Sequence, residues 1–339
     1  MKKLFVLIMA IALVGAFTLP AMAADWNFYG SSRFKTFTME ESDYGDEEAE
    51  TDWTNQGNSR IGAKVKNGDI SGRFEYGTGV NLRQLWGAWN FGAGTLLIGQ
   101  TYTPITMFIG NQVYGSDNGA LNYGGIYGLR RPMIQVQLNS FKIALVRPET
   151  NDLGGTARKT VPKIEAEYTY KADTFFVEVV GGYQSYIVDT AGGDEVDVNS
   201  MVYAVGGGVN FGPAYVKANV MGGQNIGPYG MWTTAYGASA MPTITGGDDL
   251  NDNDTIGYLG VLGFKANDKL KFEAGYGFVS HELDVSGADA DETTCFYAQA
   301  NITIAPGFFI VPELGVIDYE DDAEDGSDTY FGAKWQINF

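Results

Sequence analysis

Histidine and cysteine are almost absent from this chain. Its 339 residues include one histidine, His281, and one cysteine, Cys295. A single cysteine excludes an internal disulfide bond, and a single histidine leaves no cluster for a transition metal and little material for a nucleophilic catalytic site. We therefore expect a protein that is not an enzyme and that binds neither a metal nor a cofactor.

Long apolar runs are confined to the first residues. Two lysines precede an apolar run over residues 4–19, and the small-x-small motif Ala-Met-Ala follows at residues 21–23. This pattern predicts a cleaved signal peptide over residues 1–23 and one exported domain over residues 24–339. No later stretch approaches the ~18 uninterrupted apolar residues of a membrane-spanning helix, so a membrane form of this protein must be a barrel.

Positive charge is also scarce. Lysine and arginine total 22 against 41 aspartates and glutamates, which gives a formal net charge of −19. The acids gather in residues 40–52 and 318–328, with smaller groups at 189–197, 248–254 and 282–292. Because these segments lie between strand-like segments, we predict that they are loops. So acidic a surface repels phosphate, which excludes nucleic acid as a partner.

Glycine and aromatic residues are abundant, with 46 Gly, 20 Tyr and 20 Phe. Residues 59–66 and 69–76 alternate between apolar and polar side chains, and Asn67 and Gly68 join them. Asn-Gly is the strongest two-residue hairpin signal, and such alternation suits a strand between lipid and water. This segment therefore predicts an antiparallel hairpin with one apolar face and one polar face.

Similar hairpins can be drawn along most of the exported chain. Candidate short turns lie at residues 91–94, 139–140, 171–173, 211–213, 266–269 and 305–307. With a first strand near residues 26–39 and a last alternating strand ending on Phe339, the count is about sixteen, within the range of bacterial barrels. The sequence predicts an all-β fold: a transmembrane antiparallel β-barrel of about 16 strands, with short periplasmic turns and long acidic external loops.

Three segments resemble Gram-negative general diffusion porins. Residues 58–64 and 72–76 resemble the second and third strands of that family, and residues 82–104 are similar to its next strand, Phe-Gly turn and strand. The family often carries an arginine near Gly99, where this chain has Gln100 and Thr101. The resemblance implies a sixteen-stranded outer-membrane barrel, a homotrimer surrounded by lipid and lipopolysaccharide, and a long third external loop folded into the lumen.

By this resemblance, the constriction loop covers residues 105–129. The polar face of the first strands carries several bases, and a base on the lipid face would cost ~2–4 kcal/mol at the bilayer midplane, so we expect them to face the lumen. The predicted pore-lining and constriction residues are Arg33, Lys35, Arg60, Lys64, Arg73, Arg83, Tyr114, Asp117 and Asn118. A transverse field between the wall bases and Asp117 would then act on passing solutes. The wall bases favour anions and the acidic loops concentrate cations, so the ion preference stays open.

The predicted function is passive diffusion of small hydrophilic solutes and ions through a water-filled channel in the outer membrane of a Gram-negative bacterium. Two alternatives stay open: a substrate-specific channel for a sugar, a peptide or an anion, and a closed structural or adhesive barrel. Other motifs carry little weight. His281, predicted in a loop beside Glu282, forms only a coincidental acid-base set, and residues 248–254 lack the central glycine and terminal glutamate of an EF-hand.

Overall fold

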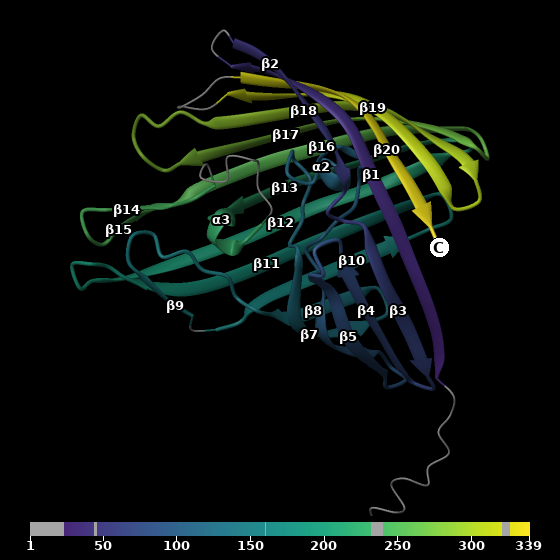
Figure 1. Cartoon of the computed structure of the whole chain (residues 1–339). Helices are drawn as coiled ribbons and strands as arrows, with labels where there is room; N and C mark the ends of the chain where they lie inside the picture. The colour runs from purple at the N-terminus through teal and green to yellow at the C-terminus, as the bar shows by residue number, and fades with distance from the viewer. Residues whose placement is uncertain (1–23, 44–45, 160, 232–239, 321–325) are drawn as a thin grey trace, which may run out of the picture.

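The computed structural model describes residues 24–43, 46–159, 161–231, 240–320 and 326–339, and the predicted signal peptide lies outside them. The described chain forms a large antiparallel sheet that curves round on itself (Figure 1). Its strands are β1 (Asp25–Asp43), β2 (Asp46–Asn55), β3 (Arg60–Asn67), β4 (Ile70–Gly77), β5 (Leu82–Asn90), β6 (Thr95–Tyr102), β7 (Arg130–Leu138), β8 (Phe141–Val146), β9 (Thr156–Lys159), β10 (Lys163–Lys171), β11 (Phe175–Asp189), β12 (Glu195–Phe211), β13 (Ala214–Gln224), β16 (Asn253–Asn267), β17 (Leu270–Leu283), β18 (Asp291–Ala305), β19 (Phe308–Glu320) and β20 (Gly326–Asn338). Between β13 and β16, β14 (Thr243–Thr245) pairs with β15 (Asp249–Asn251).

The strands close into a barrel with sixteen wall positions among the described residues. Strands β2 and β3 pair with successive parts of β1, and β9 and β10 pair with successive parts of β11, so the 18 strands of the sheet fill sixteen positions. Pairing of β1 with β20 closes the cylinder. The terminal Phe339 continues this pairing, since its N–H donates to the Gly30 carbonyl and its own carbonyl accepts from the Gly30 N–H. The predicted barrel of about 16 strands is confirmed.

Short turns join the strands at one end, as the sequence predicts. They lie at residues 68–69, 91–94, 139–140, 172–174, 212–213, 268–269 and 306–307. The first turn lies one residue later than predicted, because Asn67 belongs to β3 and pairs with Ile70. Gly68 has a φ of +59°, a left-handed conformation that glycine adopts without a steric penalty. Because turn chemistry is local, a few residues determine where each hairpin bends.

The two large acidic segments differ from their prediction as loops, apart from residues 44–45 and 321–325, which lie outside the described residues, whereas residues 190–194 and 284–290 of the smaller groups are loops as predicted. Residues 40–43 continue β1, residues 46–52 belong to β2, and the register between the two strands runs without interruption from Phe34↔Asn55 to Asp43↔Asp46. The acidic ends of β19 and β20 pair in the same way. Extended backbone pairing satisfies the main-chain groups whatever the side-chain charge, so acidic residues can belong to strands that continue into water.

Side chains alternate between the two surfaces of the wall. Ile61, Leu85, Leu262 and Leu314 lie on the outer surface, each more than half exposed, whereas Arg83 and Glu75 face inward and are buried. An apolar outer band is what a barrel needs where it meets lipid. Arg33 and Arg60 lie on the predicted polar parity of β1 and β3 and border an internal cavity. Arg83 borders it too, but not through the predicted parity: it shares its parity with the outward Leu85 and turns inward at a register shift in the pairing of β4 with β5.

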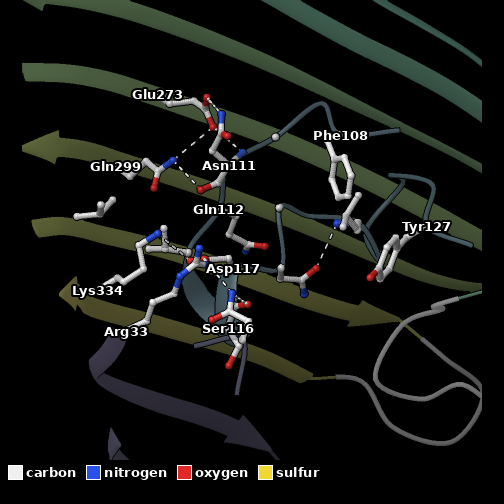
Figure 2. A pocket seen from close by; sticks show the side chains of 18 of the residues that line it. Arg33, Phe108, Asn111, Gln112, Ser116, Asp117, Tyr127, Glu273, Gln299 and Lys334 are labelled. Carbon is white, nitrogen blue, oxygen red and sulfur yellow. Dashed lines mark hydrogen bonds and ion pairs between the residues drawn. The ribbon is translucent and has the colours of Figure 1, made fainter. Parts of the chain in front are cut away.

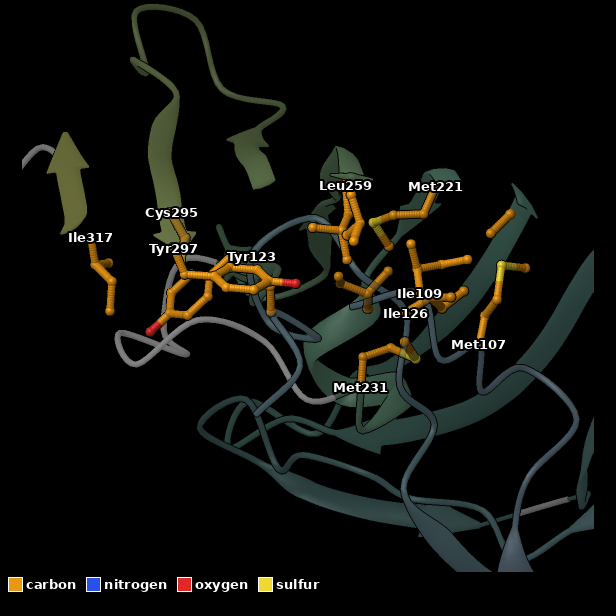
Figure 3. Packing of buried hydrophobic residues seen from close by; sticks show 14 of the residues in the cluster. Met107, Ile109, Tyr123, Ile126, Met221, Met231, Leu259, Cys295, Tyr297 and Ile317 are labelled. Carbon is orange, nitrogen blue, oxygen red and sulfur yellow. The ribbon is translucent and has the colours of Figure 1, made fainter. Parts of the chain in front are cut away.

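Two connections fold into the barrel and build a core there. The segment between β6 and β7 contains the short helix α2 (Tyr114–Asp117), and the segment between β13 and β16 contains α3 (Ile226–Tyr229). Figure 3 shows Ile109 and Ile126 of the first segment beside Met231 of the second, together with wall residues. No helix in the described ranges is long and apolar enough to cross a membrane.

His281 also differs from its prediction. It lies in β17 rather than in a loop, it is buried, and its Nδ1 is 2.8 Å from the Thr255 hydroxyl on β16. Every second residue of β17 faces inward, and His281 is one of them. Its imidazole therefore lies against the segments that fill the lumen.

Candidate pore and constriction segment

The constriction segment, residues 103–129, leaves the wall after β6 and returns to it at β7. A backbone bridge between Met107 and Ile126 holds its two arms together. Met107, Ile109 and Ile126 are buried, whereas Phe108 between them is 54% exposed. The constriction segment therefore has one apolar face that packs inside the barrel and a second face, carrying Phe108, that is exposed.

Gly124 allows the segment to approach the far wall closely. Its φ is +83°, and a Cβ at this position would lie 2.1 Å from the Tyr258 carbonyl oxygen on β16. The Asn219 side-chain amide on β13 donates to the Gly124 carbonyl at 2.8 Å. Only glycine fits a backbone in this conformation against another strand.

Carboxylates of the opposite wall anchor the constriction segment. Glu313 on β19 accepts hydrogen bonds from the Val113 and Tyr114 N–H groups at 2.7 and 2.8 Å. Glu273 on β17 accepts from the Asn111 N–H at 2.8 Å and from the Asn111 side-chain amide at 2.6 Å (Figure 2). The segment therefore crosses the lumen and is bonded to strands far from those that it joins.

Loss of the Glu313 anchor is expected to loosen the constriction. In Glu313→Ala, the N–H groups of Val113 and Tyr114 lose their acceptor, at a cost of about 1–3 kcal/mol for each buried donor. Single-channel recording should then show a noisier current with openings above the wild-type level. Glu313→Gln keeps one acceptor oxygen and should be intermediate. A Glu313→Ala channel as quiet as wild type would contradict the anchoring role.

Asp117, at the tip of the segment, contacts the wall directly. Its carboxylate forms ion pairs with Arg33 on β1 and with Lys334 on β20, the second at 2.9 Å, and accepts from the Asn58 amide at 2.9 Å. The predicted field between Asp117 and distant wall bases is therefore wrong in its geometry, because Asp117 and Arg33 touch instead of facing each other across water. Figure 2 shows Arg33 and Lys334 converging on this carboxylate.

Three of the predicted bases converge on one acid. The buried Glu75 carboxylate on β4 accepts from Arg83 at 2.8 Å and from Arg73 at 2.7 Å, and Arg60 lies 3.7 Å away. The Tyr29 hydroxyl donates to the same carboxylate at 2.9 Å. A carboxylate with this many donors holds the arginine side chains in fixed positions on the inner wall.

The remaining predicted residues have different surroundings. Lys35 forms an ion pair with Asp52 on β2, and Lys64 lies 5.8 Å from the centre of the Tyr29 ring. Tyr114 packs against the wall, with its ring stacked on Tyr330 at 3.9 Å. Asn118 borders the cavity and its side-chain oxygen accepts from the Leu121 N–H.

A cavity of about 950 Å³ lies between the constriction segment and the inner wall. Of the predicted residues, it is bordered by Arg33, Arg60, Arg83, Asp117 and Asn118, but not by Lys35, Lys64, Arg73 or Tyr114. Sequence reasoning missed four further cations and one acid at its surface, Arg130, Lys217, Lys271, Lys334 and Glu273. Strand alternation could have found those on β13, β17 and β20, but the resemblance pointed only to bases of the first strands.

Comparison with known proteins supports the same architecture. The sequence matches no known family model and no curated protein. Its structure is similar to the outer-membrane channel DcaP of Acinetobacter baumannii, with a TM-score of 0.75, 16% identity, and coverage of 93% of this chain and 97% of that chain. An anion-selective porin from Comamonas acidovorans is similar with a TM-score of 0.63 and 13% identity, over 93% of this chain and 100% of that chain. A trimer form of OmpT from Vibrio cholerae is similar with a TM-score of 0.62 and 16% identity, over 93% of this chain and 99% of that chain.

These likenesses extend over nearly the whole of each chain, at identities that establish the fold alone. Closure of β1 on β20 and the sixteen wall positions agree with them. The chain therefore has the fold of the Gram-negative outer-membrane porins.

Proposed function

We propose that this protein is a porin in the outer membrane of a Gram-negative bacterium, exported by its signal peptide and open to passive diffusion of small hydrophilic solutes and ions. One observation carries the proposal: a charged cavity of about 950 Å³ inside a closed barrel, between the constriction segment and the wall. A closed structural barrel would not need charged side chains around open internal space, because each buried charge is costly unless it is paired or hydrated.

The charges around the cavity favour anions. Seven of its bordering residues are basic and two, Asp117 and Glu273, are acidic. Asp117 is shared by Arg33 and Lys334, and Glu75 holds Arg60 and Arg83. Arg130, Lys217 and Lys271 have no acidic partner within 4.0 Å in the described part of the chain. Their charge acts inside the narrow lumen, where screening over ~8 Å in physiological salt leaves it effective.

The proposal includes a homotrimer in contact with lipid and lipopolysaccharide. Strands β3 to β8 have 6 to 9 residues, whereas β16 to β20 have 13 to 15, so one side of the barrel wall is low. One similar structure is described as a trimer form. A low apolar wall suits contact between copies better than contact with the full thickness of lipid. Chemical cross-linking in native membranes should yield a trimer band.

Single-channel recording of the mature protein in a planar bilayer tests the function. We expect stable conductance in KCl, in steps of three, and a reversal potential in a salt gradient whose sign shows preference for chloride. An inserted barrel that carries no current would overturn the diffusion function and favour a closed structural or adhesive barrel.

The lumenal lysines are expected to determine much of this preference. In the double variant Lys217→Gln and Lys271→Gln, the reversal potential should move toward the cation side while the conductance stays close to wild type, because glutamine keeps the side-chain size. The matched control is Lys159→Gln with Lys171→Gln, which removes the same charge from residues that do not border the cavity. Equal shifts in the two double variants would show that net charge, and not the lumen, sets the preference.

A further inference from the structure

An exposed aromatic side chain faces the lumen on the constriction segment. Phe108 borders the cavity and is 54% exposed, although its neighbours Met107 and Ile109 are fully buried. Those two neighbours already pack the segment against the inner core, so packing does not require a ring at residue 108. An aromatic ring exposed to water inside a polar channel is costly unless a solute covers it.

Phe108 belongs to an aromatic group with two tyrosines. Its ring centre lies 5.2 Å from that of Tyr102, edge to face, and 6.1 Å from that of Tyr127. Tyr102 and Tyr127 also border the cavity. Figure 2 shows Phe108 and Tyr127 side by side at one edge of the pocket. The three rings form an aromatic platform, and more than half of the Phe108 surface stays exposed within it.

Arg130 adds a positive charge to this platform. Its Nη1 donates to the Tyr127 hydroxyl at 2.8 Å, and its guanidinium carbon lies 5.3 Å from the centre of the Tyr102 ring. Burial raises the pKa of Tyr127 to about 12, so this phenol stays neutral at physiological pH and does not cancel the charge. Arg83 and Arg60 border the same cavity. The aromatic platform therefore adjoins a region of positive potential.

We propose that Phe108, Tyr102 and Arg130 form a binding subsite for aromatic carboxylates within the lumen. The solute's ring stacks on Phe108, and its carboxylate accepts hydrogen bonds from the guanidinium of Arg130, which presents several donors in one plane. A ring and a carboxylate on the same small molecule match a platform and a cation that both contact Tyr127. This inference rests on the proposed channel function and names a solute class that the channel retains on its way through.

Benzoate is a suitable probe, with cyclohexanecarboxylate, acetate and benzyl alcohol as its controls. In the wild-type channel, benzoate is expected to reduce the KCl current in a saturable manner. Cyclohexanecarboxylate lacks the π face, acetate lacks the ring and benzyl alcohol lacks the charge, so each should block at least about threefold more weakly. Equal block by benzoate and cyclohexanecarboxylate, or by benzoate and benzyl alcohol, would overturn the subsite.

Single substitutions test which side chains cause the benzoate block. Phe108→Leu should weaken the benzoate block by at least about threefold, whereas Phe108→Tyr, which keeps the ring, should retain it. Arg130→Gln should weaken it by about tenfold or more through loss of a charge-assisted hydrogen bond. Arg158→Gln is the matched control, because Arg158 pairs with Asp189 and Glu195 and does not border the cavity. Unchanged block in Phe108→Leu contradicts the proposal.

The two proposals fail in different ways. Conductance in KCl without selective benzoate block refutes the subsite and leaves the channel function intact. If no current is seen, calorimetric titration of benzoate and cyclohexanecarboxylate into the detergent-solubilised wild-type protein still decides the subsite. Tighter binding of benzoate supports it, and equal or absent binding refutes it.

Discussion

Deletion of residues 110–125 is expected to raise the single-channel conductance at least about twofold, because conductance follows the cross-section of the narrowest part of a pore. These residues carry the anchors to Glu273 and Glu313 and the ion pairs of Asp117. The barrel strands pair through their own backbone groups and do not depend on this segment for hydrogen bonds. The wall should therefore survive the deletion while the obstruction disappears.

The control for this experiment is an external deletion. Residues 285–290 join β17 to β18, are largely exposed, and do not border the cavity. Their removal should leave the conductance at the wild-type level. Measurements in the same bilayer, at one salt concentration, then compare a lumenal deletion with an external one. A wild-type conductance after deletion of residues 110–125 would show that the segment does not limit the current.

Neutralising Glu75 is expected to cause the largest loss of stability by a single substitution. The Glu75 side chain is 0% exposed and faces Arg60, Arg73 and Arg83. Glu75→Gln leaves three guanidinium groups without a counter-charge inside the wall. Removal of one partner from a buried ion pair costs about 3–5 kcal/mol, because the remaining charge stays buried.

The unfolding temperature on a heat-modifiability gel measures this effect. Glu75→Gln should unfold at a temperature well below that of wild type. Adding Arg73→Gln should restore part of the lost unfolding temperature, because it removes one of the repelling charges. Asp268→Asn is the control, since Asp268 pairs with Lys265 at the short turn between β16 and β17 with its side chain 95% exposed, and such pairs contribute little. A Glu75→Gln barrel as heat-resistant as wild type would mean that water hydrates the three arginines.

The architecture was predictable because its signals are local. Alternation with a period of two marks a strand between lipid and water, and Asn67 with Gly68 marks a hairpin, whatever the rest of the chain does. The alternation recurs along the chain with short turns between its segments, so the strand number followed from counting. The acidic ends of β1 and β2 were misjudged as a loop, because charge in the sequence indicates contact with water and does not by itself exclude backbone pairing.

The candidate site was only partly predictable. The direction of Arg33 and Arg60 followed from strand parity, but that of Arg83 depends on an irregularity in the pairing of β4 with β5. The partners of all three did not follow from the sequence. Whether Tyr114 would face the pore or stack on Tyr330 depends on the path of a segment with little regular structure. No pattern in the sequence marked Phe108 as a lumenal residue, since an aromatic residue between two apolar neighbours usually indicates packing.

The sequence by itself therefore determined a barrel of about sixteen strands, the inward face of its bases and the position of the segment after β6. Only the tertiary structure decided which charges neutralise each other. Arg33 and Asp117 are 84 positions apart, and Val113 and Glu313 are 200 apart. Contacts of this kind depend on the curvature of the closed wall and on the path of the constriction segment, and neither is encoded in a pattern of neighbouring residues.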